Sequence, residues 1–349
     1  MLFCYMMATV RCVAAASSAL RQVLAGPAQP AECLGATRGA LYLNTAGHPG
    51  VLAVLAHDAV RLPCGLVLPA TSAELAPGFM IVESYAPRHN ARNSQGSWQI
   101  AVGDGAVRWT GPAGPVIVQA VREWAPARPV RGEVAAGALA SVRSLLSRAD
   151  PGIAELTRQS RRLADLALAA RPGPARPVQA CPVLANDEGA IFTTVARLLG
   201  NGPGLTPSGD DVLAGFLIGA AAFGLDAGPV RELVAALAPA RTTALSAALL
   251  WHAARGECID ELAAVAAVLT GQSGPEQAGP AVSRLLGVGH TSGAALSVGL
   301  VISAEAALHA RTRPQLAGTV LASTMLAGTV LASTVLPGTV LAASKRQVV

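Results

Sequence analysis

The spacing of apolar residues changes along the chain, from a strand-like pattern in the first part to a helical pattern after it. From about residue 37 to 132, short apolar or alternating runs recur, each bounded by Gly, Pro, Asn or Asp. Such runs predict β-strands, and their close spacing favours an antiparallel barrel or sandwich over a βαβ sheet. The expected strands lie in the segments 39–45, 50–56, 65–70, 78–84, 97–103, 106–111 and 114–120.

After Glu133, apolar residues recur at helical spacing, with Arg and Gln on the opposite face. The pattern predicts helices over 133–149 and 153–170, a Pro-rich joint over 171–182, and then a larger helical block. In that block we expect helices near 187–200, 210–223, 228–238, 241–255, 257–269, 276–287 and 292–311.

The sequence therefore predicts an α+β fold with four parts. An N-terminal extension (1–36) precedes the antiparallel β-rich barrel or sandwich-like domain (37–132). An Ala/Leu-rich α-helical domain (133–315) follows and carries the glycine-rich motifs. A low-complexity tail (316–349) ends the chain.

The tail contains three copies of a ten-residue unit, beginning LAGTVLAST, LAGTVLAST and LPGTVLAAS. Its apolar stretch raises the question of a membrane span, for which about 18 apolar residues are the usual signal. Gly, Thr and Ser in the copies and Pro337 in the third argue against a span. We expect a poorly ordered or strand-forming appendage without membrane association, and we assign it no function.

Composition narrows the functional classes. The 26 Lys and Arg residues against 21 Asp and Glu give a net charge of +5, and aromatic residues make up only 3%. No basic block is interleaved with aromatics, so we expect no nucleic-acid partner. The six cysteines lie far apart and form no CxxC pair, which predicts buried thiols in a reducing compartment. The N-terminus lacks a basic region before its apolar run, so we expect a cytoplasmic protein that starts at Met1 or Met7.

The most unusual segment is GNGPGLTPSGDD, residues 200–211, which leads directly into an apolar helix. Ser208 as N-cap with Asp211 three residues later would form a capping box, and both aspartates would favour the helix dipole. Capping does not explain the preceding glycines, such as Gly204 and Gly209. Glycine-rich loops before helix N-termini commonly let the backbone approach a bound anion.

A second segment, GVGHTSGAALSVGLVISAEAAL (287–308), has the same format. With one deletion, the two segments align in four pairs: Gly204 with Gly289, Thr206 with Thr291, Ser208 with Ser292, and Gly209 with Gly293. We expect both helices to point their N-termini at one concave pocket rimmed by N–H groups and hydroxyls. The hypothesis requires Gly209 and Gly293 to lie on the same side of the molecule.

A third expected helix start, ARTTALSAALL, contributes Arg241 and Thr242. Because a cation at a helix N-terminus opposes the dipole, an anionic ligand is one explanation for Arg241, and harmless exposure is the other.

Three motifs carry a family resemblance: PGLTPSGDDVLAGFL (203–217), RTTALSAALLWHAARGE (241–257) and GHTSG (289–293). At these residues the chain resembles a family that includes the AllH-type subunit of oxamate carbamoyltransferase. The resemblance covers residues 35 to 312 and is strongest after 185. In the family pattern an acidic residue often follows GHTSG by two positions, whereas this sequence has Ala295, which puts the strength of any activity in doubt.

The resemblance implies a subunit of a multi-component carbamoyltransferase of purine (allantoin) breakdown. It would interconvert oxalurate plus phosphate with oxamate plus carbamoyl phosphate, and it would act only with separately encoded partner subunits. A non-catalytic subunit that binds a metabolite for regulation is the alternative.

The residue chemistry fits a small anionic substrate held at the paired helix starts. We expect substrate binding by Gly204, Thr206, Ser208, Gly209, Arg241, Thr242, Thr291, Ser292 and Gly293. Asp210, Asp211 and His290 are the candidate catalytic residues. Two carboxylates repel an anion, so the aspartates either accept hydrogens from a substrate NH2 group, which we favour, or bind Mg²⁺. No metal ligand set is predicted, and the cofactor requirement is left open.

Overall fold

The computed structural model describes residues 9–85, 100–111, 114–149, 156–158, 160, 161, 163 and 182–331. Residues Met1–Ala307 form one compact unit and Leu308–Val349 form a second. The expected helix over 153–170 and the Pro-rich joint fall largely outside the described residues. The α+β fold class is confirmed, because a closed barrel is followed by a helical region.

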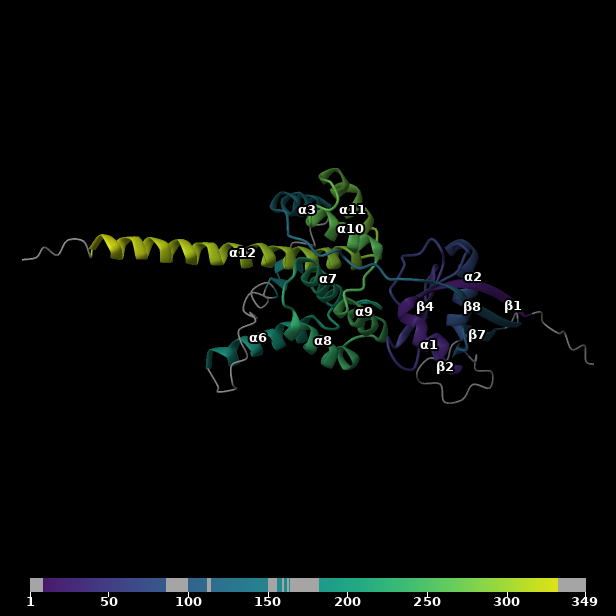
Figure 1. Ribbon diagram of the computed structural model, residues 1–349. Helices are drawn as coiled ribbons and strands as arrows, with labels where there is room; N and C mark the ends of the chain where they lie inside the picture. The colour runs from purple at the N-terminus through teal and green to yellow at the C-terminus, as the bar shows by residue number, and fades with distance from the viewer. Residues whose placement is uncertain are drawn as a thin grey trace, which may run out of the picture. The chain divides into compact units, whose positions relative to one another are not determined.

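Eight strands close into a barrel in the order β1-β5-β4-β3-β2-β6-β7-β8, with β8 pairing back to β1 (Figure 1). The strands are β1 (Val10–Ser17), β2 (Gln29–Ala36), β3 (Ala40–Asn44), β4 (Val51–Leu55), β5 (Gly65–Val67), β6 (Ile100–Gly103), β7 (Ala106–Gly111) and β8 (Gly114–Trp124).

Two features of the barrel differ from the sequence prediction. Strands β1 and β2 lie within residues 1–36, so the expected N-terminal extension supplies part of the barrel wall. The barrel is also not purely antiparallel, because β1 pairs with β8 and β4 with β5 in parallel. Strand periodicity reports which face is buried and carries no information about the partner strand or its direction.

The expected strand over 78–84 is wrong, because these residues belong to helix α2 (Ser72–Tyr85). The Thr71 hydroxyl accepts a hydrogen bond from the Glu74 N–H, and the Glu74 carboxylate accepts one from the Thr71 N–H at 2.7 Å. This is a capping box, and the sequence TSAE displays it. A short apolar run fits a strand or a helix equally well, and here the cap decides for the helix.

The barrel interior is filled by aliphatic side chains. All five residues of β4 are buried, as are Leu41 and Leu43 of β3. The short helices η1 (Ser18–Leu20) and α1 (Arg21–Ala25) add Leu20 and Leu24 to the same core. With so few aromatic residues, the chain builds this core mainly from Leu, Val and Ala, with Phe79 and Trp109 as its buried aromatic residues.

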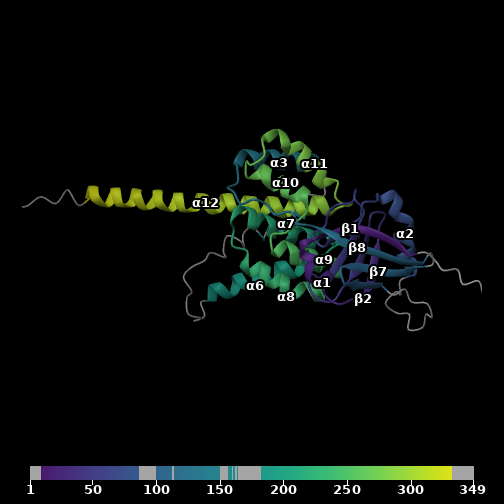
Figure 2. The same cartoon turned by 45° about the vertical axis from the view of Figure 1, so that its right-hand side comes forward.

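The helical region agrees closely with the predicted periodicity. Its elements are α3 (Ala136–Ala149), α6 (Pro182–Leu198), α7 (Ser208–Phe223), α8 (Gly228–Arg241), α9 (Ala244–Ala254), α10 (Asp260–Leu269), η2 (Pro275–Gln277), α11 (Ala278–Leu286) and α12 (Ser292–Leu331). Helix α7 is buried along almost its whole length, and in both views it lies beside the first turns of α12 (Figure 2).

Glycines allow α7 and α12 to pack with their backbones in contact. A Cβ at Gly215 would overlap the Leu296 carbonyl oxygen, and a Cβ at Gly299 would overlap that of Val212. Helices approach this closely only where small residues face each other. The matched glycines therefore hold the two look-alike helices together.

The barrel and the helical region share two contacts that matter for the site. Val51 of β4 packs in one buried cluster with Leu245 and Ala248 of α9. The chain leaving β8 forms an isolated β-bridge between Ala127 and Cys258. These contacts place the start of α9 and the turn after it against the barrel.

Part of the tail is helical, because α12 continues to Leu331. The expectation of a strand is therefore wrong up to that residue, the expectation of poor order stays a prediction, and residues 332–349 lie outside the described part. Leu and Ala, which recur in each repeat, favour helix. Within the described residues, one helix, Ser292–Arg311, is long and apolar enough to cross a membrane, and 67% of that stretch is buried inside the protein. A buried core helix has the same composition.

Candidate functional site

The starts of α7 and α12 meet. The hydroxyls of Thr206 and Ser292 lie 3.0 Å apart within hydrogen-bonding distance, and the Ser208 hydroxyl donates to the Thr291 hydroxyl at 3.3 Å. The loop before α7 and the loop before α12 thus form one continuous surface. This confirms the geometric expectation drawn from the two repeated motifs, while the roles of their residues remain predictions.

Most of the motif glycines serve backbone packing. A Cβ at Gly209 would overlap the Leu198 carbonyl, one at Gly293 would overlap that of Leu285, and one at Gly200 would overlap that of Arg241. Gly204 differs, because it is exposed, has a φ of +93°, and a Cβ added to it would meet nothing within 4 Å. Of these four glycines, only Gly204 has free space around the position of an added Cβ.

The capping prediction is wrong in detail. Pro207 is the N-cap of α7, and its carbonyl accepts the N–H groups of Asp210 and Asp211. The Gly209 N–H donates to the Asn201 carbonyl and the Gly293 N–H donates to that of Val288. These backbone donors are already used within the chain, so the surface at the helix starts is defined mainly by side-chain hydroxyls and a carboxylate.

Asp210 is a structural anchor. Its side chain is buried, with 2% of the residue exposed, and it accepts hydrogen bonds from the Gly200 N–H at 2.8 Å and from the Thr242 hydroxyl. Burial raises the pKa of Asp210, and the Thr242 and Gly200 hydrogen bonds oppose that rise. Asp210 thereby joins the glycine-rich loop to the segment before α9.

Asp211 has a different environment. Only 6% of it is exposed, and its Oδ2 atom is buried without a hydrogen-bond partner. Burial raises the pKa of Asp211 to about 7, a hydrogen bond from Ser292 works against the rise, and the nearby Asp210 adds to it. A buried acceptor without a partner costs about 1–3 kcal/mol, so a donor from a ligand would be stabilising here.

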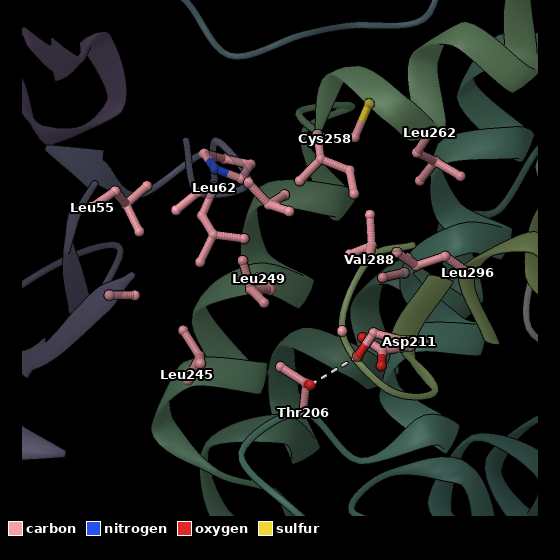
Figure 3. A pocket seen from close by; sticks show the side chains of 18 of the residues that line it. Leu55, Leu62, Thr206, Asp211, Leu245, Leu249, Cys258, Leu262, Val288 and Leu296 are labelled. Carbon is pink, nitrogen blue, oxygen red and sulfur yellow. Dashed lines mark hydrogen bonds between the residues drawn. The ribbon is translucent and has the colours of Figure 1, made fainter. Parts of the chain in front are cut away.

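Asp211 lines a cavity of about 450 Å³ (Figure 3). Thr206, Ser292 and Gly289 lie at the same polar end, and the dashed line in the figure marks the hydrogen bond made by Thr206. Aliphatic side chains form most of the remaining wall, including Leu55, Leu62, Leu245, Leu249, Leu262, Val288 and Leu296. The lining therefore comes from the barrel, α7, α9, α10 and α12 together.

Four other predicted site residues are not among those that line this cavity. Arg241 ends α8, where a cation is favourable to the helix dipole, and its guanidinium donates to the Ala196 carbonyl. The expected conflict at a helix N-terminus does not exist, because Thr243 is the N-cap of the next helix. Thr242 donates to Asp210, which is the chain neighbour of the cavity residue Asp211. His290 and Thr291 are exposed in the turn before α12.

Sequence reasoning missed an ionic network that borders the cavity. Glu257 lines the cavity and accepts from Arg128 at 2.5 Å, while its other oxygen lies 2.7 Å from Nδ1 of the fully buried His252. Burial alone would raise the pKa of Glu257, but His252 and Arg128 hold it below its ordinary value. The pKa of His252 is lowered by burial, against the opposing effect of Glu257. The only sequence signal was the motif HAARGE itself.

The cysteines and possible metal ligands add no further site in the described part of the chain. Cys64 and Cys258 are buried and free, while Cys12 and Cys33 are free and half-buried. Among the described residues, no group of three or more His, Cys, Asp or Glu side chains is placed to hold a metal ion. Asp210 and Asp211 direct their carboxylates to different partners, so they do not form a paired ligand set.

The comparison with known protein families found a match in the part of the chain that contains both motif loops. Residues 198–304 match the family model described as oxamate carbamoyltransferase subunit AllH. The matched range includes α7, α8, α9, α10, α11 and the first turns of α12, and with them both motif loops. No solved structure shows a significant match to the chain. Over residues 198–304, about a third of its length, the chain is therefore similar to the oxamate carbamoyltransferase subunit AllH.

Proposed function

We propose that this chain binds the substrate of a carbamoyltransferase that converts oxalurate and phosphate into oxamate and carbamoyl phosphate, in purine (allantoin) catabolism. The match of residues 198–304 to the AllH family model supports a carbamoyltransferase subunit. One observation carries the choice of site: the starts of α7 and α12 join through Thr206 and Ser292, beside the unpartnered oxygen of Asp211.

The chemistry requires both hydrogen-bond acceptors and donors. A phosphate oxygen attacks the carbamoyl carbon, the bond from that carbon to the oxalyl amide nitrogen breaks, and this nitrogen takes up a proton. Asp211 accepts a hydrogen from the carbamoyl NH2 group. The hydroxyls of Thr206 and Ser292 donate to the carbamoyl oxygen, where negative charge develops in the transition state. Asp211 and His290 are the two titratable candidates for the proton transfer.

The anionic end of the substrate is held at the rim of the cavity. There the positive ends of the α7 and α12 dipoles converge, which favours a small anion. We assign this rim to the exposed residues Gly204, His290 and Thr291 and to the half-buried Ser208, whose hydroxyl donates to that of Thr291. Arg241 and Thr242 act indirectly: Thr242 donates a hydrogen bond to Asp210, and Arg241 donates one to the Ala196 carbonyl near the end of α6. We propose that the protein is cytoplasmic and that the remaining catalytic groups come from partner subunits.

A regulatory, non-catalytic subunit is the second candidate. It is favoured by the lining of the cavity, in which no described residue is Lys, Arg or His. Such a chain would bind a metabolite at the same place without turnover.

The decisive experiment is to co-purify the chain with its partner subunits and to measure carbamoyl phosphate formed from oxalurate and phosphate. Asp211→Leu should abolish activity while the complex still assembles. Arg21→Ala serves as the control and should leave the rate unchanged, because Arg21 begins α1, pairs with the exposed Glu123 and does not line the cavity. Ligand binding by the complete complex without any turnover would favour the regulatory role.

A further inference from the structure

The cavity at the starts of α7 and α12 is larger than its polar end requires. Its volume of about 450 Å³ lies in the range of about 300–1,000 Å³ that holds complete drug-sized ligands. Thr206, Asp211 and Ser292 occupy one end, and the wall that faces them across the cavity is mainly aliphatic (Figure 3).

The charged groups of the lining are not equivalent. The carboxylates among the described lining residues are Asp58, Asp211 and Glu257. Asp58 accepts from the Ser72 hydroxyl and N–H, and Glu257 is bonded to His252 and Arg128. Within the described lining, Asp211 alone has a buried oxygen without a partner.

This combination defines a complementary ligand. An anionic body would lose its hydration against aliphatic walls and would also meet carboxylates, so it is disfavoured inside the cavity. An N–H donor at one end would satisfy Asp211, and an apolar body would gain from burial against the leucines.

We propose that the cavity binds carbamoyl compounds whose NH2 group hydrogen-bonds to Asp211 and whose body is uncharged and apolar, such as N-alkyl or N-aryl ureas. The inference rests on the proposed function for the choice of the carbamoyl group. It goes further by naming the class of body that the inner cavity accepts.

The test uses phenylurea as the probe and isothermal titration calorimetry of the full chain. Phenylurea should bind, and phenylacetate, which carries a carboxylate on a similar ring, should bind at least tenfold more weakly. Asp211→Leu should weaken phenylurea binding by about tenfold or more, since a hydrogen bond to a charged group is lost.

Two neighbouring positions on α9 provide a matched pair for the apolar wall. Ala253 lines this cavity, whereas Ala254 lines a separate one between α8, α9 and the turn at His48. Ala253→Leu should reduce phenylurea affinity about tenfold by filling the cavity, and Ala254→Leu should leave it unchanged. Thermal unfolding of each variant shows that both are folded.

Three results would overturn the inference: no phenylurea binding, tighter binding of phenylacetate, or equal phenylurea affinity in the wild type, Asp211→Leu and Ala253→Leu. The proposed function fails separately. Carbamoyl phosphate production by the complex without phenylurea binding rejects only the inference. Phenylurea binding with the expected variant pattern, but no turnover of oxalurate by the complex, rejects only the transferase role.

Discussion

The hydroxyls of Thr206 and Ser292 lie 3.0 Å apart, although 86 residues separate them in the chain. This contact joins the loop before α7 to the first residue of α12, and it lies beside Asp211 in the cavity lining. The two repeated motifs therefore act as one unit, and a change in either loop should affect both.

Replacing Thr206 with Val tests this contact directly. The change keeps the shape of the side chain and removes the hydroxyl, so unfolding free energy should fall by about 1 kcal/mol. If the hydroxyl also stabilises developing charge, the turnover number of the complex should fall by about 10²-fold or more. Chemical denaturation and the carbamoyl phosphate assay measure the two effects. Thr206→Ser should restore most of the activity, and a variant with lost stability but unchanged turnover would contradict the proposed role.

The glycines between α7 and α12 make a second prediction. Gly215→Ala places a methyl group against the Leu296 carbonyl, and neither backbone can move aside easily. We expect a loss of about 1–3 kcal/mol in unfolding free energy, as for other overpacked cores. Gly279 in α11 is the control, because nothing lies within 4 Å of its Cβ position. Gly279→Ala should stabilise the helix by about 1 kcal/mol. Equal effects at the two positions would show that α7 and α12 are not in close contact.

Asp211 should make stability depend on pH. Its folded-state pKa of about 7 exceeds the ordinary carboxyl value of about 3.9, so the folded protein holds this proton more tightly than the unfolded chain. Between about pH 4 and pH 7 the contribution of Asp211 to stability therefore falls as pH rises, and above pH 7 the full cost is present.

The variant Asp211→Leu removes this pH-dependent contribution to the unfolding free energy. Its unfolding free energy relative to wild type should increase from pH 4 to pH 8, as measured by urea denaturation at each pH. The pH dependence of the stability contributed by Asp58 should have the opposite sign, because hydrogen bonds from Ser72 lower the pKa of Asp58. The stability that Asp58 contributes is present above the unfolded pKa and is lost as pH falls through the folded pKa, so Asp58→Asn should cost stability at pH 8 and progressively less as the pH falls below about 3.9. A pH-independent difference for Asp211→Leu would contradict the burial of an unpartnered carboxylate.

Arg128 should matter more than a surface ion pair. Arg128→Ala leaves the Glu257 carboxylate, which is 7% exposed, without its cationic partner, and we expect a loss of about 1–3 kcal/mol. The exposed pair of Arg21 and Glu123 is the comparison, and Arg21→Ala should cost about 0–1 kcal/mol. Differential scanning calorimetry would measure both. If the two variants melt alike, the His252–Glu257–Arg128 network does not stabilise the contact between the barrel and the helices.

Deleting residues 316–349 tests the tail. We expect the shortened chain to remain in the soluble fraction to the same extent as the full chain, and its melting temperature to stay unchanged, because the tail belongs to a separate compact unit. Fractionation of membranes and cytosol measures the first, and thermal unfolding the second. Release of the full chain from a membrane pellet only after this deletion would show that the tail is a membrane anchor.

The sequence by itself determined the elements with strong periodicity and the identity of the motif residues. Helical spacing predicted α7 to α11 and the start of α12, because a long amphipathic or buried helix repeats its pattern over several turns. The repeated Gly–Thr–Ser–Gly format also predicted that the two helix starts would meet. Prediction from hydrophobic periodicity failed for α2, because a short apolar run fits a helix or a strand. It also failed for β1 and β2, where the strand pattern was weak.

Only the tertiary structure separated the two aspartates. Asp210 and Asp211 are neighbours with the same side chain, yet Asp210 is bonded to Gly200 and Thr242, while Asp211 faces a cavity with one oxygen unpartnered. The same holds for the parallel strand pairs of the barrel and for the ionic network at Glu257. These features depend on which distant segments become neighbours, and hydrophobic periodicity carries no record of that choice.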